Sequence, residues 1–290
     1  MNGELSTSLA LSHVHQHIHS TPQLEAKDIF ACKPAEIVDI ALSNLQNAGI
    51  ELIEWRALLQ RRMNVPRCVN VYLPTSLDFL PLTSSFPRGQ SFSYLVRDGD
   101  LERASAILLE IGLPITPPTN LYLSTEGDFR AKGHYHRITR ATSVASVQHL
   151  TLYPLSFSTL SLSEMEEKPP YHMTPSSCQS ILVPSPPAVY ASILRMMRHY
   201  PRFCGTRYIL QSDLSELIGY HLLGLEGYVD PSDDEEWATL EIDRRLADAV
   251  HRVHTWGADG LWREDEEWIR EALAAVVGGM AKIEDLPCKT

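Results

Sequence analysis

The sequence is poor in cysteine and has no long apolar run, and each absence excludes a class of protein. Its five cysteines are scattered and never form a Cys-x-x-Cys pair: Cys32, Cys68, Cys178, Cys204 and Cys288. A disulfide framework or a thiolate zinc knuckle would show regular spacing, so we expect reduced thiols in a cytoplasmic protein. No apolar run approaches the roughly 18–20 residues that span a bilayer. Residues 1–20 lack the basic and apolar regions of a signal peptide, so we expect a soluble protein.

Basic residues and the common nucleotide-binding motifs are also scarce. Lys and Arg together number 25 against 36 Asp and Glu, and the formal net charge is −11. Nucleic acids and anionic membranes are bound by basic surfaces, so we expect neither as a partner. The sequence contains no G-x-x-x-x-G-K-[ST], no G-x-G-x-x-G and no G-x-S-x-G. The commonest nucleotide-binding and serine-hydrolase signatures are therefore missing.

The apolar pattern that is present predicts an α/β fold, in which a small mixed sheet with flanking helices precedes a mostly helical C-terminal half. Helical and strand periodicities alternate in the first half, and four helical patterns follow residue 181. The predicted strands are 49–55, 92–96 and 147–153, and the predicted helices are 34–48, 57–63, 101–111, 187–200, 212–223, 240–253 and 264–280.

Composition divides the chain into four parts. We expect a mobile, His-rich N-terminus at 1–20, an α/β domain at 21–153, a linker or long loop at 154–180 and a helical region at 181–290. Residues 67–92 are rich in Pro and Ser and nearly uncharged. This stretch is interpreted as a loop inserted into the α/β domain, or as translated intron sequence.

Alternating histidines mark the N-terminus at His13, His15, His17 and His19. In a strand all four imidazoles would share one face, and imidazole is a good ligand for zinc, nickel or copper. One hypothesis is therefore a metal-dependent hydrolase that uses these residues. The alternative is a terminal tract that binds metal only adventitiously.

Two carboxylates, Asp98 and Asp100, follow the predicted strand 92–96. Paired carboxylates at a strand end can hold Mg²⁺ against substrate phosphates. Asp-Gly-Asp is also ordinary turn chemistry, and Asp100 precedes a predicted helix that it could cap. Both interpretations stay open.

The strongest basic cluster lies between residues 130 and 140. If this segment were extended, alternation would place Arg130, Lys132, His134 and His136 on one face, and Arg137 and Arg140 lie close by. Such a cluster could receive a phosphate or a carboxylate. The alternative is a solvated strand face whose charges pair with nearby acids.

Four segments together resemble a family of largely uncharacterised fungal proteins with a minimal nucleotidyltransferase-like core. They are AGIELIEWRALLQRRMNVP (48–66), SYLVRDGDLERASAILLEIGLP (93–114), ILVPSPPAVYASILR (181–195) and SDLSELIGYHL (212–222). The match covers about two thirds of the chain. The resemblance implies a strand that leads into a short helix, a second strand and a helical second half.

The sequence departs from the pattern of active members of this fold. They use a Gly-Ser turn and a D-x-D on the next strand, whose carboxylates hold two Mg²⁺ ions against a triphosphate. No Gly-Ser occurs in this sequence, and the strand that the resemblance suggests, Val69 to Leu73, offers Asn70 and Tyr72. Two-metal catalysis then has no template, so we expect a pseudoenzyme.

Three functions are therefore carried forward. The first is a catalytically degenerate nucleotidyltransferase-like protein that binds a nucleotide or phosphate through the basic cluster, with Mg²⁺ needed only if activity remains. The second is a non-catalytic interaction protein that docks a protein partner through its helical C-terminal half and is linked to fungal biosynthetic genes. The third is the metal-dependent hydrolase built on the N-terminal histidines.

Overall fold

A mixed sheet forms the centre of the molecule, with strand order β3-β4-β2-β1-β6-β5. The computed structural model describes residues 28–66, 92–143, 147–226 and 240–289. Its helices and strands are η1 (Ile29–Ala31), α1 (Pro34–Asn47), β1 (Ile53–Trp55), α2 (Ala57–Arg62), β2 (Phe92–Val96), η2 (Asp98–Asp100), α3 (Leu101–Glu110), α4 (Asn120–Glu126), α5 (Asp128–Lys132), β3 (His134–Arg137), β4 (His149–Pro154), α6 (Leu155–Ser158), η3 (Leu162–Glu164), β5 (Met165–Lys168), β6 (Ile181–Pro184), α7 (Pro186–Arg198), α8 (Gly205–Leu217), η4 (Ile218–Leu222), α10 (Ile242–Ala258), α11 (Glu267–Val277) and η5 (Ile283–Asp285).

The inner strands run in both directions. β1 pairs antiparallel with β2 and parallel with β6, while β2 pairs parallel with β4. The outer strands β3 and β5 are antiparallel to β4 and β6. All residues of β1 and β2 are buried, because helices cover both faces of this part of the sheet. The expected α/β class with a mixed sheet is confirmed.

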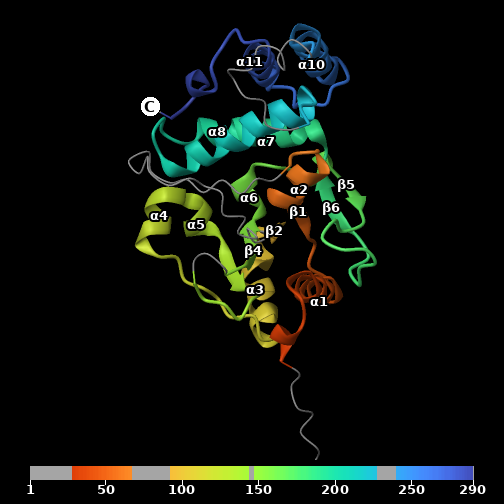
Figure 1. Ribbon diagram of the computed structural model, residues 1–290, viewed down its shortest axis with the longest axis vertical. Helices are drawn as coiled ribbons and strands as arrows, with labels where there is room; N and C mark the ends of the chain where they lie inside the picture. Colours follow the sequence, from red (N-terminus) through yellow and green to blue (C-terminus); the bar gives the residue numbers. More distant parts are fainter. Residues whose placement is uncertain (1–27, 67–91, 144–146, 227–239, 290) are drawn as a thin grey trace, which may run out of the picture.

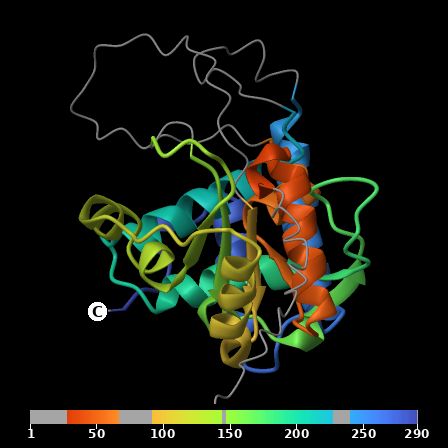
Figure 2. The ribbon, with the colours of Figure 1, turned by 90° about the horizontal axis from the view of Figure 1, so that it is seen from below.

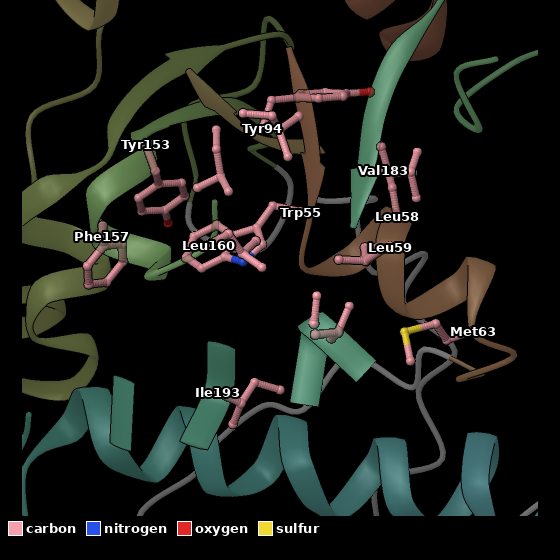
Figure 3. Packing of buried hydrophobic residues seen from close by; sticks show 14 of the residues in the cluster. Trp55, Leu58, Leu59, Met63, Tyr94, Tyr153, Phe157, Leu160, Val183 and Ile193 are labelled. Atoms are coloured by element: carbon pink, nitrogen blue, oxygen red, sulfur yellow. The ribbon is translucent and has the colours of Figure 1, made fainter. Parts of the chain in front are cut away.

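The helices form layers on the two faces of the sheet. α1 and α3 lie side by side against one face (Figures 1 and 2). α1 begins at Pro34, which suits a first helical position, and Glu36 accepts a hydrogen bond from the backbone N–H of Lys33. On the other face α7 and α8 cross the sheet, and α10 and α11 pack outside them (Figure 1). Figure 3 shows Trp55 of β1 and Ile193 of α7 in the core between these layers.

Two glycines join the α4–α5 segment to the start of α8. A Cβ atom on Gly205 would lie 2.3 Å from the carbonyl oxygen of Thr125, and one on Gly127 would lie 2.4 Å from the hydroxyl of Thr206. That hydroxyl accepts a hydrogen bond from the Asp128 N–H at 2.9 Å. The α/β part and the helical part are therefore in direct backbone contact rather than tethered by a linker.

The stretch 154–180, expected to be a linker or long loop, includes helical turns and a strand of the sheet. It contains α6, η3 and the sheet strand β5, and the next residues form β6, which pairs with β1. The sheet thus takes strands from both sides of the predicted boundary. The helices predicted after residue 186 are present as α7, α8 with the π-helical turn η4, α10 and α11. The His-rich tract 1–20 and nearly all of the predicted loop 67–92 lie outside the described residues.

No helix among the described residues is long and apolar enough to cross a membrane.

Candidate functional site

One face of the sheet carries a row of side chains from four neighbouring strands. The register places Tyr135 opposite Thr151, Thr151 beside Ser93, and Ser93 opposite Trp55. Residues that are paired across neighbouring strands point to the same face. The row ends at the carboxyl end of β1, where the chain turns into α2. The strand–turn–helix unit that the resemblance implies is therefore bordered by Ser93 and Thr151.

Arg56 forms the turn between β1 and α2. Its backbone has φ 51° and ψ −115°, a region that costs a non-glycine residue about 1–3 kcal/mol and that recurs at functional sites. The guanidinium lies 4.4 Å from the centre of the Phe129 ring, and its Nε is 3.5 Å from a carboxylate oxygen of Asp213 on α8. Although burial opposes the charge, the Asp213 carboxylate raises the pKa of Arg56 above its ordinary value. Arg56 therefore stays cationic and serves as a bridge from the turn to α8.

A small cavity adjoins this turn. Its volume is about 30 Å³, enough for one or two water molecules and far below the roughly 300–1,000 Å³ of a ligand pocket. Aromatic rings occupy the surrounding space, since Trp55 contacts Phe129, Tyr153 and Phe157 at centroid distances of 4.9–5.8 Å. A nucleotide has no room at this turn. The lining residues are Trp55, Arg56, Leu59, Gln60, Phe129, Leu160, Val189, Ser192, Ile193, Met196, Leu210, Asp213 and Leu217.

The described residues do not fit a pair of Mg²⁺ ions at this turn. Of the two strands that pair with β1, β2 is the antiparallel one, and its residues on the face of the turn are Ser93 and Leu95. β2 carries no carboxylate, and the carboxylate of β1, Glu54, lies on the opposite face and is held by Arg62 at 2.7 Å. No cluster of three or more His, Cys, Asp or Glu that could hold a metal occurs in the described part of the chain. The strand suggested earlier, 69–73, lies outside it.

Asp98 and Asp100 are remote from the turn. They lie in η2, beyond the carboxyl end of β2, whereas Trp55 is level with Ser93 near the start of that strand. A carboxylate oxygen of Asp98 accepts a hydrogen bond from the Ser156 N–H at 2.9 Å. Asp100 occupies the N-cap position of α3. Its side chain makes no capping hydrogen bond and instead lies 3.9 Å from Arg103.

The predicted basic segment does not form one strand, because residues 128–132 form α5 and only residues 134–137 form β3. The expected shared face of Arg130, Lys132, His134 and His136 is therefore wrong. Lys132 lies 3.6 Å from Asp128, and Arg140 pairs with Asp28.

The two predicted histidines point to the other face of the sheet. His136 is fully buried, with Nε2 3.0 Å from the Ser105 hydroxyl and Nδ1 3.0 Å from the Leu113 carbonyl oxygen. Burial lowers the pKa of His136 and favours its neutral form. His134 lies 3.7 Å from Glu102 on α3. Neither residue faces the row of Tyr135 and Thr151.

The structure instead gathers two of the predicted arginines around a histidine that sequence reasoning did not select. Arg137 and His149 are directly paired across β3 and β4, on the same face as Tyr135. The His149 ring lies 5.7 Å from the Tyr135 ring. The Arg130 guanidinium is held between the rings of Tyr122 and Tyr135, 4.2 Å from each centroid. We call Arg130, Arg137 and His149 the β3–β4 cationic cluster.

The charges of this cluster are only partly compensated. Arg130 donates two hydrogen bonds to Glu126, at 2.8 and 3.2 Å. Arg137 has no carboxylate within ion-pair distance among the described residues, and its guanidinium lies 5.7 Å from the Phe30 ring. The Arg137 Nε and the His149 Nε2 are both buried and have no hydrogen-bond partner in that part of the chain. Buried polar atoms usually have a hydrogen-bond partner, and these two belong to residues that are directly paired across β3 and β4, so the pair offers a place for an acceptor.

The electrostatic state of His149 reflects these neighbours. Burial is the largest cause that lowers its pKa to about 4, and the charges of Arg130 and Arg137 lower it further. His149 is therefore neutral at physiological pH in the unliganded protein. The local potential is positive, which favours an anion.

Comparisons with protein-family models, with curated proteins and with solved structures find no match for this chain.

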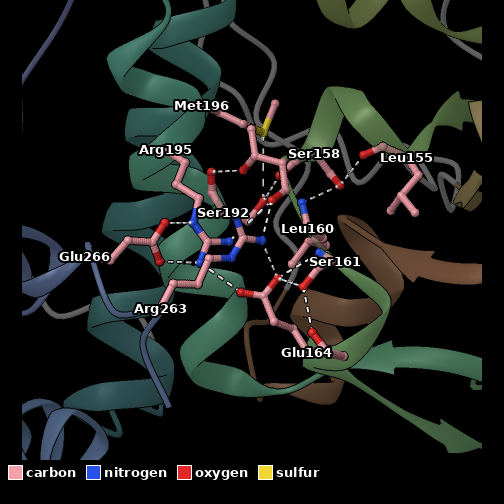
Figure 4. A network of polar contacts seen from close by, with 12 residues as sticks. Leu155, Ser158, Leu160, Ser161, Glu164, Ser192, Arg195, Met196, Arg263 and Glu266 are labelled. Atoms are coloured by element: carbon pink, nitrogen blue, oxygen red, sulfur yellow. Dashed lines mark hydrogen bonds and ion pairs between the residues drawn. The ribbon is translucent and has the colours of Figure 1, made fainter. Parts of the chain in front are cut away.

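A second charged cluster connects the helical layers and is shown in Figure 4. Arg195 of α7 contacts Glu266 at 2.5 Å and Glu164 at 2.8 Å, and Arg263 contacts Glu164 at 2.8 Å. Arg195 and Glu266 are each only 7% exposed. We call these four residues the α7–α11 charge network. It fixes the start of α11 to the body of the protein.

Proposed function

We propose that this protein is a catalytically inactive, nucleotidyltransferase-like protein that binds a phosphate group, free or carried by a nucleotide, at the β3–β4 cationic cluster. The observation that carries the proposal is a pair of buried nitrogens, Arg137 Nε and His149 Nε2, which have no hydrogen-bond partner among the described residues and lie near a second guanidinium. A phosphate oxygen between the two nitrogens would satisfy both. Charge-assisted bonds of this kind are about twice as strong as neutral hydrogen bonds.

The absence of catalysis in this proposal rests on the turn between β1 and α2. Among the described residues, β2 presents Ser93 and Leu95 on the face of the turn, and the adjoining cavity of about 30 Å³ is bordered by aromatic rings. The strand to which the resemblance assigns the carboxylate positions, 69–73, offers Asn70 and Tyr72 in the sequence and lies outside the described residues. Phosphoryl and nucleotidyl transfer depend on metal ions or cations that neutralise charge on the transferred group. The described turn supplies only Arg56, which is already engaged by Asp213.

The test is thermal unfolding of the purified protein with inorganic phosphate, pyrophosphate and ATP, each with and without Mg²⁺. A ligand at 100 times its dissociation constant adds about 2.7 kcal/mol to the stability of the folded state, which raises the midpoint by a few degrees. We expect a rise with pyrophosphate or ATP that Mg²⁺ does not increase, and no nucleotidyl transfer to any acceptor.

The variants Arg137→Gln and Arg140→Gln form a matched pair, since both arginines lie near the end of β3 but Arg140 already pairs with Asp28. Arg137→Gln should abolish the stabilisation and Arg140→Gln should preserve it. Equal losses in both variants would indicate diffuse charge attraction instead of a site. A shift that requires Mg²⁺ would contradict the inactive-turn interpretation.

A further inference from the structure

In the described part of the chain, the charged groups that act on the His149 ring are basic side chains. The charged neighbours that act on its ring are Arg130 from α5 and Arg137 and His136 from β3, and all three disfavour its protonation. Tyr135 adds a ring edge at 5.7 Å and no charge. Glu126 of α4 accepts two hydrogen bonds from Arg130. In the unliganded site a proton on His149 has no counter-charge of its own.

An anion between Arg137 and His149 reverses this balance. A dianion would place negative charge beside the buried Nε2 and would also neutralise the Arg137 guanidinium that opposes protonation. A nearby opposite charge favours the charged form of an ionisable group, and a hydrogen bond to that form favours it further. The imidazolium would then donate its Nε2–H to the anion, while Arg137 donates its Nε–H from the neighbouring strand.

We infer that the β3–β4 cationic cluster binds a tetrahedral dianion together with one proton, which His149 takes up from solvent. This inference rests on the proposed phosphate site. Binding of the dianion is then linked to pH through a single residue. The ligand class is a phosphate or sulfate dianion, or a terminal phosphate of a larger molecule. Affinity rises as the solution becomes more acidic, because the free protein must acquire the proton that the complex holds.

Sulfate is the probe for the test, because it carries no proton near neutral pH and any proton taken up must be held by the protein. Isothermal titration calorimetry at pH 6.5, in two buffers of different ionisation enthalpy, measures the number of protons taken up per sulfate bound. We expect a value close to one. Between pH 7.5 and 6.0 the dissociation constant should fall by about tenfold per pH unit, as linkage to one proton requires.

His149→Gln is the informative variant, since glutamine keeps an N–H donor but cannot take up a proton near neutral pH. It should bind sulfate with no proton uptake and with an affinity independent of pH. His251→Gln, on the exposed surface of α10, is the control and should behave as the wild type. A folded His149→Gln protein is verified by an unchanged thermal midpoint at pH 7.5.

The possible failures are distinguishable. Sulfate binding to the wild type without proton uptake, or equal proton uptake in His149→Gln, would overturn the inference and leave the proposed phosphate site standing. No binding of sulfate, phosphate or pyrophosphate at any pH would overturn both.

Discussion

The two charged clusters of this protein differ in how completely their charges are paired. In the α7–α11 charge network each arginine contacts a carboxylate, and Glu164 serves two arginines at 2.8 Å each. In the β3–β4 cationic cluster, Arg137 has no ionic partner among the described residues and two buried nitrogens lack hydrogen bonds. In the first cluster the protein's own carboxylates neutralise the arginines. The second retains nitrogens without a partner among the described residues, and the proposed ligand would supply that partner.

This difference separates a structural role from a binding role. Buried ions need partners, because desolvation costs several kcal/mol for each charge. The α7–α11 charge network meets this need internally, so its residues hold helices together. In the β3–β4 cationic cluster Arg130 is held by Glu126, whereas Arg137 and His149 each keep a nitrogen without a partner among the described residues, so we expect substitution of Arg137 to affect binding of the proposed ligand more than stability. Substitutions in the two clusters should therefore have opposite effects on stability and on binding.

The largest effect is expected from Glu266→Ala in the α7–α11 charge network. It removes one of the two carboxylates that contact the buried Arg195 guanidinium. Breaking a buried ion pair on one side typically costs 3–5 kcal/mol, and we expect a loss of about 3 kcal/mol in the free energy of unfolding, measured in urea. Glu271→Ala, at an exposed pair with Arg270, is the control and should cost less than about 0.5 kcal/mol. A loss below about 1 kcal/mol for Glu266→Ala would show that the α7–α11 charge network contributes no more to stability than the β3–β4 cationic cluster.

A smaller loss is expected from Gly133→Ala, which affects the support of the binding cluster. The added Cβ would lie 2.7 Å from the Tyr135 ring and 2.8 Å from the Tyr153 ring. Overpacking of this kind costs about 1–3 kcal/mol, and movement of Tyr135 would also displace His149 and weaken pyrophosphate binding. Gly99→Ala meets no atom within 4 Å and should change neither quantity. Urea unfolding and calorimetry measure the two effects, and unaltered binding in a destabilised Gly133→Ala protein would contradict this link.

The pH dependence of the free energy of unfolding should reflect the lowered pKa of His149 in the cationic cluster. Burial lowers the pKa of both His149 and His221 to about 4, below the ordinary value of 6.5. As the pH falls from about 6.5 towards 4, the unfolded chain takes up protons that the folded protein refuses, so stability declines. Urea unfolding at several pH values should show this decline. Sulfate should reduce it in the wild type but not in His149→Gln, and a decline unaffected by sulfate would contradict the role of His149.

The smallest effect on stability is expected from Arg137→Met. Its guanidinium has no carboxylate within ion-pair distance in the described structure and lies 5.7 Å from the centre of the Phe30 ring, an interaction of about 0.5–1 kcal/mol at most. The free energy of unfolding should change by less than about 1 kcal/mol, while phosphate-dependent stabilisation disappears. A loss above about 2 kcal/mol in urea unfolding would show that Arg137 holds the fold together and would place it with the structural network.

Local patterns in the sequence were sufficient to predict much of the fold. Helical periodicity gave α1 and α3 within about one residue at each end, because each has an apolar stripe and a glycine at its end. The strand pattern likewise located β1 and β2. Alternation was misleading at 130–136, where α5 occupies residues 128–132 and the strand begins only at His134. Gly127, with φ 54°, allows the chain to start this helix directly after α4.

The candidate site depended on contacts that no local pattern reveals. Arg137 and Arg130 were selected for their charge, but His149 joins them only through the register of β3 against β4. The basic character of Lys132 and Arg140 is neutralised by Asp128 and Asp28, the second of which is 112 residues away in sequence. Arg56 and Asp213 are likewise brought together only by tertiary structure. One signal in the sequence could have indicated His149. It lies in a predicted strand, 147–153, that follows the basic segment, and two such neighbouring strands often pair.

The most direct test of the account is a crystal structure of the protein with tungstate, an electron-dense analogue of phosphate. We predict an oxyanion within hydrogen-bond distance of both Arg137 Nε and His149 Nε2, and its absence from crystals of Arg137→Gln. Tungstate bound beside Arg56 instead, or no oxyanion at the β3–β4 cationic cluster at saturating concentration, would contradict the central claim.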